Sequence, residues 1–217
     1  MVWLMVVCGM VCVVLTESRA SFYIEMDIIL GLVGKDYVMT VADRAQARSI
    51  VVFKHDEDKI FELDGHMVMA TAGPQGDRAN FAEYIQRNIQ LYKYRNDLPL
   101  TTKGAANFTR NELATFLRKS PYQVNLLMAG YDEKVGPSLY YMDYLGSMHK
   151  MGFAAHGYGS YFTLSTMDRY YKEGMDLEQG KELMMKCIKM LQQRFLINCP
   201  KFICKIVTKD GITTSEL

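Results

Sequence analysis

Apolar and polar residues along the chain follow a strand-like pattern first and a helical pattern later. From Ile28 to Val33 and from Tyr37 to Ala42 the residues are almost all apolar, and a Gly-Lys-Asp turn separates the two runs. This arrangement predicts a β-hairpin. Further short strands are predicted at Ile50–Phe53, Lys59–Leu63 and Met67–Thr71, with an Asp-Gly-His turn between the last two. The first third of the chain is therefore expected to be an antiparallel meander.

The pattern becomes helical after Gly73 and Pro74. Apolar residues then recur at steps of three and four, which predicts an amphipathic helix. Its apolar positions are Phe81, Tyr84, Ile85, Ile89 and Tyr92. A second helix is predicted from about Thr102 to Arg118. It is expected to end there because the residue before Pro121 is disfavoured in the helical conformation.

The second half of the chain repeats this succession of strands and helices. Residues 123–132 and 138–143 predict another hairpin, and two helices are predicted at Ser160–Tyr171 and Leu177–Phe195. A last strand is predicted at Phe202–Thr208. Strands and helices that come in separate runs pack as layers. The order therefore predicts an α+β fold in which two packed sheets are covered by helices on their outer faces.

Composition limits the classes of function. The 217 residues are 49% apolar and 23% charged, which is enough material for one well-buried domain. The net charge is only +1, so the chain lacks the strong basic field that nucleic-acid binding usually needs, and we expect no nucleic-acid partner.

The cysteines and histidines do not have the spacing typical of metal ligands. The five cysteines have no finger-like or CxxC spacing, and we interpret them as free thiols in a reducing compartment. The four histidines are scattered, so neither a metal site nor a cofactor site is predicted. The 16 methionines are expected mainly to fill the core.

The first 25 residues contain an apolar segment that differs from the rest of the chain. Val2 to Leu15 are apolar except for Gly9, as in a secretory signal, but no Lys or Arg precedes them. The run is also shorter than the roughly 20 residues that span a bilayer, so no membrane anchor is expected. We favour a single domain at residues 26–217, with residues 1–25 as a dispensable leader or an upstream extension. A secreted chain that is glycosylated at Asn107 remains an alternative.

Blocks of residues in a fixed order, from Met26 to the end of the chain, resemble one protein family. The blocks are Tyr37-Val38, Ala42-Asp43-Arg44, Asp58-Lys59-Ile60, Phe81-Ala82-Glu83-Tyr84-Ile85-Gln86, Leu91-Tyr92, Ala105-Ala106-Asn107-Phe108-Thr109-Arg110, Pro121-Tyr122-Gln123-Val124-Asn125-Leu126-Leu127, Ala129-Gly130-Tyr131-Asp132, Gly136-Pro137, Leu139-Tyr140-Tyr141-Met142-Asp143-Tyr144 and Phe153-Ala154-Ala155-His156-Gly157-Tyr158-Gly159. Taken together they resemble the beta-type subunits of the 20S proteasome, and most of all the eukaryotic non-catalytic beta-4 type.

This resemblance implies the alpha-beta-beta-alpha sandwich of the N-terminal nucleophile hydrolases, in agreement with the predicted layers. In active members of the family an N-terminal threonine supplies the nucleophilic hydroxyl, and its own free amine serves as the base. The resemblance also implies partners: other beta subunits within the ring and across the ring–ring interface, alpha-ring subunits, and indirectly a regulatory particle. The implied location is the cytoplasm and the nucleus, with no membrane partner.

The family's catalytic positions can be carried over one at a time. The supporting aspartate falls on Asp43 and the supporting lysine on Lys59. The threonine position falls on Asp27, which follows Met26 rather than the glycine after which active precursors are cleaved. The resemblance therefore implies a site without its nucleophile, in which Asp43 and Lys59 are expected to persist as a buried ion pair.

The other catalytic positions of the family fall on Tyr158, Phe195 and Asn198, none of which has the required chemistry. We therefore expect no catalytic residue, and a structural subunit that builds the beta ring and the chamber wall for intracellular protein degradation. The alternative is an active N-terminal threonine hydrolase with an unrecognised processing site. Thr40 is one candidate, although it is expected to lie in the middle of a strand.

Overall fold

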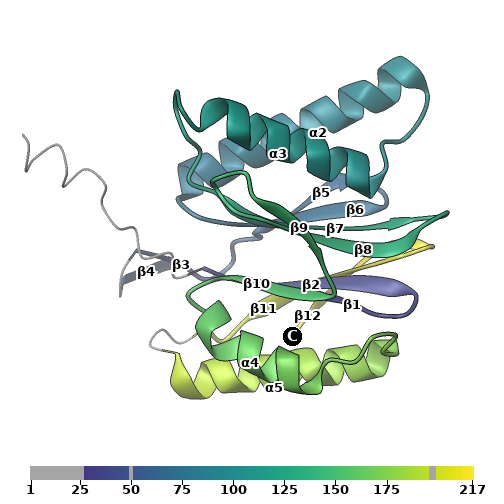
Figure 1. Cartoon of the computed structure of the whole chain (residues 1–217). Helices are drawn as coiled ribbons and strands as arrows, with labels where there is room; N and C mark the ends of the chain where they lie inside the picture. The colour runs from purple at the N-terminus through teal and green to yellow at the C-terminus, as the bar shows by residue number, and fades with distance from the viewer. Residues whose placement is uncertain (1–26, 49–50, 196–198) are drawn as a thin grey trace, which may run out of the picture.

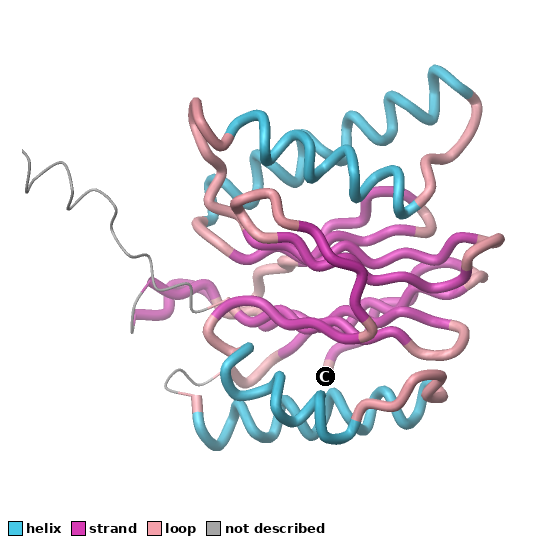
Figure 2. Tube along the Cα trace, in the orientation of Figure 1, coloured by secondary structure: helices cyan, strands magenta, loops and turns pink. Residues whose placement is uncertain are grey.

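The structure is a computed structural model that describes residues 27–48, 51–195 and 199–217. Within these residues, two five-stranded sheets lie face to face, and a pair of helices covers the outer face of each sheet (Figures 1 and 2). The predicted helix, sheet, sheet, helix sandwich is confirmed.

The first sheet places the two earliest strands at its centre. Its spatial order is β10 (Phe153–Gly157), β1 (Ile28–Val33), β2 (Tyr37–Asp43), β11 (Phe202–Thr208) and β12 (Gly211–Glu216), and neighbouring strands are antiparallel. Every residue of β2 is buried, because one face of the strand meets a helical layer and the other meets the second sheet. This accounts for its almost continuous apolar sequence.

The second sheet follows the order of the chain. It consists of β5 (Ile60–Asp64), β6 (Met67–Ala72), β7 (Asn125–Asp132), β8 (Gly136–Met142) and β9 (Met148–Met151). The helices α2 (Gln75–Asn96) and α3 (Thr102–Phe116) are inserted between β6 and β7 and cover this sheet, whereas α4 (Ser160–Tyr170) and α5 (Leu177–Arg194) cover the first sheet (Figure 1). The short strands β3 (Gln46–Arg48) and β4 (Val51–Lys54) form a ribbon beside the sandwich.

The predicted meander in the first third of the chain is wrong. The hairpin β1–β2 and the hairpin β5–β6 both form, but they belong to different sheets. Turn residues determine which neighbouring strands pair, and they carry no information about which sheet a hairpin joins. The sequence pattern does not predict β3, β9, β10 and β12, and α3 ends at Phe116, before the expected Arg118.

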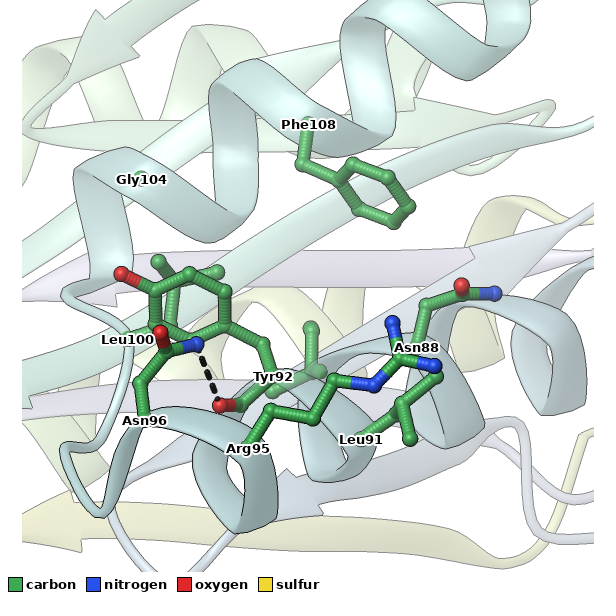
Figure 3. A pocket seen from close by; sticks show the side chains of 9 residues that line it. Asn88, Leu91, Tyr92, Arg95, Asn96, Leu100, Gly104 and Phe108 are labelled. Atoms are coloured by element: carbon green, nitrogen blue, oxygen red, sulfur yellow. Dashed lines mark hydrogen bonds between the residues drawn. The ribbon is translucent and has the colours of Figure 1, made fainter.

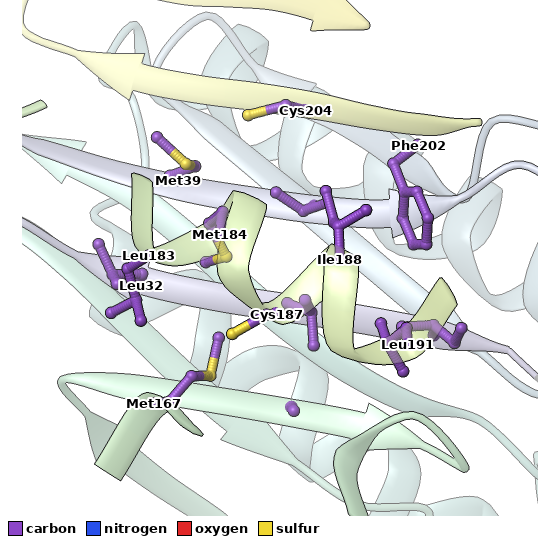
Figure 4. Packing of buried hydrophobic residues seen from close by; sticks show 14 of the residues in the cluster. Leu32, Met39, Met167, Leu183, Met184, Cys187, Ile188, Leu191, Phe202 and Cys204 are labelled. Atoms are coloured by element: carbon purple, nitrogen blue, oxygen red, sulfur yellow. The ribbon is translucent and has the colours of Figure 1, made fainter. Parts of the chain in front are cut away.

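The face of α5 shows how one helical layer is attached. Asp176 and Gln179 form a capping box at its start. Its buried side chains pack onto β1, β2 and β11 (Figure 4), and the set is Leu183, Met184, Cys187, Ile188 and Leu191 against Leu32, Met39, Phe202 and Cys204. A fully buried side chain of this size contributes about 1.5–3 kcal/mol. Met39, Met167 and Met184 lie within this cluster, in agreement with the expected core role of methionine.

The interior between the two sheets is lined by branched aliphatic side chains and alanines, and His156 lies beside them. Gly31 faces Leu139, and a Cβ at Gly31 would lie 2.9 Å from that side chain. His156 on β10 stacks on Tyr141 of β8, with ring centroids 4.0 Å apart and an interplanar angle of 17°. Burial lowers the pKa of His156 to about 4. The imidazole between the sheets is therefore neutral at pH 7.

This histidine should make the fold sensitive to acid. An unfolded histidine has a pKa near 6.5, so between about pH 6.5 and pH 4 the unfolded chain binds a proton that the folded chain does not bind. The free energy of unfolding should therefore fall as pH decreases through this range, by about 3 kcal/mol in all. Urea unfolding of the wild type and of His156→Phe at pH 7, 6 and 5 measures this difference.

The variant His156→Phe keeps a ring against Tyr141 and should lack this part of the pH dependence. His149→Phe is the matched control, because His149 lies on the exposed edge strand β9. Equal pH slopes in the wild type and in His156→Phe would contradict the prediction.

Candidate functional site

Chain segments from both sheets meet at one end of the sandwich. Asp27 directly precedes β1 and Asp43 ends β2, and the register of these antiparallel strands, in which Ile29 pairs with Ala42, brings the two aspartates together. Lys59 directly precedes β5 in the other sheet. The local hairpin and the packing of the two sheets thus assemble three residues that are far apart in the sequence.

The ammonium group of Lys59 is at the centre of this site. Its Nζ donates to both carboxylate oxygens of Asp43, at 2.9 Å each, and to Asp27 Oδ1 at 2.5 Å. It also donates to the carbonyl oxygen of Ala45 at 2.7 Å. The lysine side chain is 0% exposed, so all its hydrogen-bond partners are protein groups within the fold.

Asp43 fixes the surrounding backbone. Its Oδ1 accepts from the N–H of Ile28 at 2.8 Å, and its Oδ2 accepts from the N–H of Ala45 at 3.1 Å. Burial raises the pKa of Asp43, and the neighbouring Lys59 charge opposes that rise. For Lys59, burial alone would lower the pKa, but the two carboxylates outweigh it and raise the pKa above its usual value. The lysine therefore remains a cation.

A second ion pair lies on the other side of Asp27. Arg78, in the first turn of α2 and 3% exposed, donates to Glu57 Oε1 at 2.7 Å and to the carbonyl oxygen of Gly73 at 2.8 Å. Its Nε lies 3.6 Å from Asp27 Oδ2, and the same oxygen accepts from the N–H of Gly73 at 2.9 Å. The two oxygens of Asp27 thus contact different donors.

Two of the remaining predicted positions, Tyr158 and Phe195, contact other aromatic side chains. Tyr158 follows β10, and its ring centroid is 6.3 Å from that of Phe195 at the end of α5 and 5.5 Å from that of Tyr161. Among the described residues no hydrogen bond joins Tyr158 or Phe195 to Lys59. Asn198 lies outside the described residues. The structure therefore brings together Asp27, Asp43 and Lys59. Two further positions carried over from the family, Tyr158 and Phe195, form an aromatic contact with each other.

Three members of the site, Arg78, Glu57 and Gly73, are not predicted from the sequence. One signal for Arg78 was available, because it precedes Phe81 by three positions and so lies on the apolar face of the predicted helix. A charged residue on such a face needs a buried partner. No comparable signal marks Glu57, which lies in a charged stretch typical of an exposed loop.

Cys199 and Thr40 are the thiol and the internal threonine to consider near this site, and both are buried. Burial raises the pKa of Cys199 to about 12, and the nearby charge of Asp43 adds to this, so the group stays a thiol. Thr40 is buried in the middle of β2 between Gly31 and Lys205, and its hydroxyl donates to the carbonyl oxygen of Lys205. Cleavage before Thr40 would break the central strand of the first sheet.

Other classes of site have no support in the part of the chain that the structure describes. No group of three or more His, Cys, Asp or Glu side chains there could hold a metal ion. No helix there is long and apolar enough to cross a membrane. Asn107, the sequon residue, lies within α3, where its side-chain amide donates to the carbonyl oxygen of Lys103.

Comparison with known proteins identifies the class. The family model described as "Proteasome subunit" matches residues 27–207, so the chain belongs to the proteasome subunit family. Among the beta subunits of that family, it is 53% identical to "Proteasome subunit beta type-2-A" of Arabidopsis thaliana over 186 residues, which are 86% of this chain and 91% of the relative. It is 43% identical to "Proteasome subunit beta type-4" of Saccharomyces cerevisiae over 189 residues, which are 86% of this chain and 96% of the relative. The predicted resemblance to proteasome beta subunits is confirmed.

Removal of the Lys59 ammonium alone should be strongly destabilising, because it leaves buried carboxylates without a cation. Lys59→Met removes the ammonium and leaves Asp43 and Asp27 without their shared cation, so unfolding should become easier by about 3–5 kcal/mol. The free energy of unfolding in urea at pH 7 measures this change.

Lys181→Met is the matched control. Lys181 is half-buried on the solvent side of α5 and pairs with the exposed Glu178 at 3.0 Å, an arrangement worth at most about 0.5 kcal/mol. If both variants lose the same small amount of stability, the role given to Lys59 is wrong.

Proposed function

We propose that this chain is a non-catalytic, structural beta subunit of the 20S proteasome core particle. In this proposal it helps to build the beta ring and the wall of the chamber in which other subunits cleave protein. The observation that carries the proposal is the state of residue 27: a carboxylate bound to Lys59 and to the N–H of Gly73 occupies the position at which the family's nucleophilic threonine is expected.

The chemistry of that position argues against catalysis. An N-terminal threonine hydrolase needs a hydroxyl and a free amine on the same residue. The side chain of Asp27 has no hydroxyl, and when ionised it only accepts hydrogen bonds. Lys59 is shared between Asp27 and Asp43, so its charge is already neutralised by two carboxylates. The remaining supporting residues therefore have no nucleophile to activate.

Exposed apolar side chains on the α2–α3 layer support a role in assembly. They belong to α2 and the residues after it, and the set is Tyr84, Leu91, Tyr92, Tyr94 and Leu98. Between the two helices lies a groove of about 390 Å³, which Tyr92 and Arg95 of α2 and Phe108 of α3 line (Figure 3). Apolar and aromatic side chains with an arginine are typical of the central part of a protein interface.

The opposite helical layer carries a second exposed apolar set. It contains Tyr158, Tyr161, Leu164, Tyr170 and Met185, on or next to α4 and α5. A subunit within a stack of rings needs contact surfaces on more than one side. The partners in this proposal are other beta subunits within the ring and across the ring–ring interface, alpha-ring subunits, and indirectly a regulatory particle, in the cytoplasm and the nucleus.

The role of such a subunit is confinement. A closed wall keeps an unfolded substrate close to the threonines of other subunits and so raises its local concentration.

The assembled domain in this proposal comprises residues 26–217, and residues 1–25 are a dispensable leader or an upstream extension. The start of the family match at residue 27 supports this boundary.

A covalent probe tests the absence of a nucleophile. Native 20S particles that contain this chain are treated with an electrophile that reacts with N-terminal threonine, and the intact mass of each subunit is then measured. We expect no added mass on this chain, a mature start at Met26 or Asp27, and added mass on the catalytic subunits of the same particle, which serve as the internal control.

Two results would overturn the proposal. One is probe mass on this chain together with a newly exposed N-terminal threonine, which would make it an active hydrolase. The other is a mature chain that copurifies with no proteasome subunits.

A further inference from the structure

A pocket lies at the end of the sandwich opposite to Asp27. The strand β1 runs from Ile28, beside the ionic cluster, to Val33 at the far end, a length of about 20 Å for its six residues. The pocket at that far end has a volume of about 500 Å³, which is within the usual range for small-ligand sites. It shares no lining residue with the ionic cluster around Lys59.

Segments from both sheets and from one helical layer form the walls of this pocket. They are the turn after β1, the start of β8, the connection between β9 and β10, and the residues that follow α4. The pocket therefore exists only when the two sheets and the α4–α5 layer are packed together.

Hydrogen bonds hold these walls in place. The hydroxyl of Tyr171 donates to the carbonyl oxygen of Val33 at 3.2 Å, and the N–H of Val33 donates to the carbonyl oxygen of Gly152 at 2.8 Å. A Cβ at Gly152 would lie 2.7 Å from the Tyr171 hydroxyl oxygen, so the tyrosine lies directly against this backbone. The folded chain thus forms the pocket before any ligand binds.

The charged groups of the pocket are two lysines and one glutamate. Lys35 comes from the turn after β1 in the first sheet, and Lys150 comes from β9 in the second sheet. Within the described part of the chain neither ammonium group has a hydrogen-bond or ion-pair partner. Burial raises the pKa of Tyr171, and the charge of the nearby Glu173 adds to that rise. Two cations and one carboxylate leave the pocket with a net positive charge.

This set of groups indicates the class of ligand. A lysine ammonium binds phosphate as a point charge, and a phosphate monoester carries nearly two negative charges at pH 7, which matches the two lysines. The carboxylate of Glu173 only accepts hydrogen bonds, so it suits hydroxyl groups of the ligand and repels a second anionic group. Val33, Pro137 and the ring of Tyr171 offer apolar surface to a carbon skeleton.

We propose that this pocket is a binding site for a small phosphate monoester whose organic part carries hydroxyl groups, such as a sugar phosphate. Lys35 and Lys150 hold the phosphate, and Glu173 accepts from the hydroxyl groups. The site is additional to the structural role proposed above and does not depend on it.

Calorimetric titration of the full-length chain with ribose 5-phosphate tests the site. Saturable binding is expected at low ionic strength, and sodium chloride should weaken it because both lysines are exposed to solvent. Lys35→Met and Lys150→Met should each weaken the binding about fivefold. Inorganic phosphate should bind more weakly than ribose 5-phosphate, because it has neither the carbon skeleton nor the sugar hydroxyls.

Lys134→Met is the matched control. Lys134 is exposed in the nearby turn between β7 and β8 and does not line the pocket, so its loss changes the net charge equally and should leave binding nearly unchanged. Glu173→Met separates the two parts of the ligand. It should strengthen the binding of inorganic phosphate, because a repelling charge is removed, and reduce the preference for ribose 5-phosphate.

Three results would overturn the proposal. The first is no binding of ribose 5-phosphate, and the second is equal binding of ribose 5-phosphate and inorganic phosphate to the wild type. The third is an equal loss in Lys134→Met and Lys150→Met, since the attraction is then the charge of the whole surface. Each of these results leaves the proposed non-catalytic role standing, because the labelling of native particles tests that role separately.

Discussion

The ammonium of Lys59 joins the two sheets at one end of the sandwich. Asp43 ends a strand of the first sheet and Lys59 precedes a strand of the second, so the ion pair between them fixes how the sheets meet. Both side chains are buried, and breaking such a pair leaves an uncompensated charge in the interior. The backbone at Ile28 and at Ala45 depends on the same aspartate. The position of residue 27 follows from these constraints.

In the proposed non-catalytic role, the same physics explains how the supporting pair of the family's site can persist without catalysis. A residue that replaces threonine at position 27 need not lower the free energy of unfolding if its side chain accepts hydrogen bonds from the donors at that position. Asp27 does this with one oxygen on Lys59 and the other on the N–H of Gly73. Loss of Lys59 or Asp43 would instead leave a buried charge. If the chain serves as a wall of the particle, as we propose, it must therefore keep the supporting pair but can change residue 27.

Local pattern in the sequence was sufficient to predict the three hairpins β1–β2, β5–β6 and β7–β8, the four helices and the layer order. That β1–β2 and β5–β6 join different sheets could not be predicted. Turn residues indicate which consecutive strands pair, but they do not indicate which sheet a hairpin joins. The resemblance to a family led to Asp27, Asp43 and Lys59, and the structure brings these three together. Glu57 and Gly73 could not be found in this way, because their role comes from contacts between segments that only folding brings together.

The measurement that tests this account most directly is a map of the assembled particle at a resolution that shows the side chain of residue 27. The account predicts a carboxylate there, with one oxygen on Lys59 Nζ and the other on the N–H of Gly73, and no free N-terminal threonine in this subunit. An Asp27 side chain turned away from both donors, or a processed threonine facing Lys59, would contradict it.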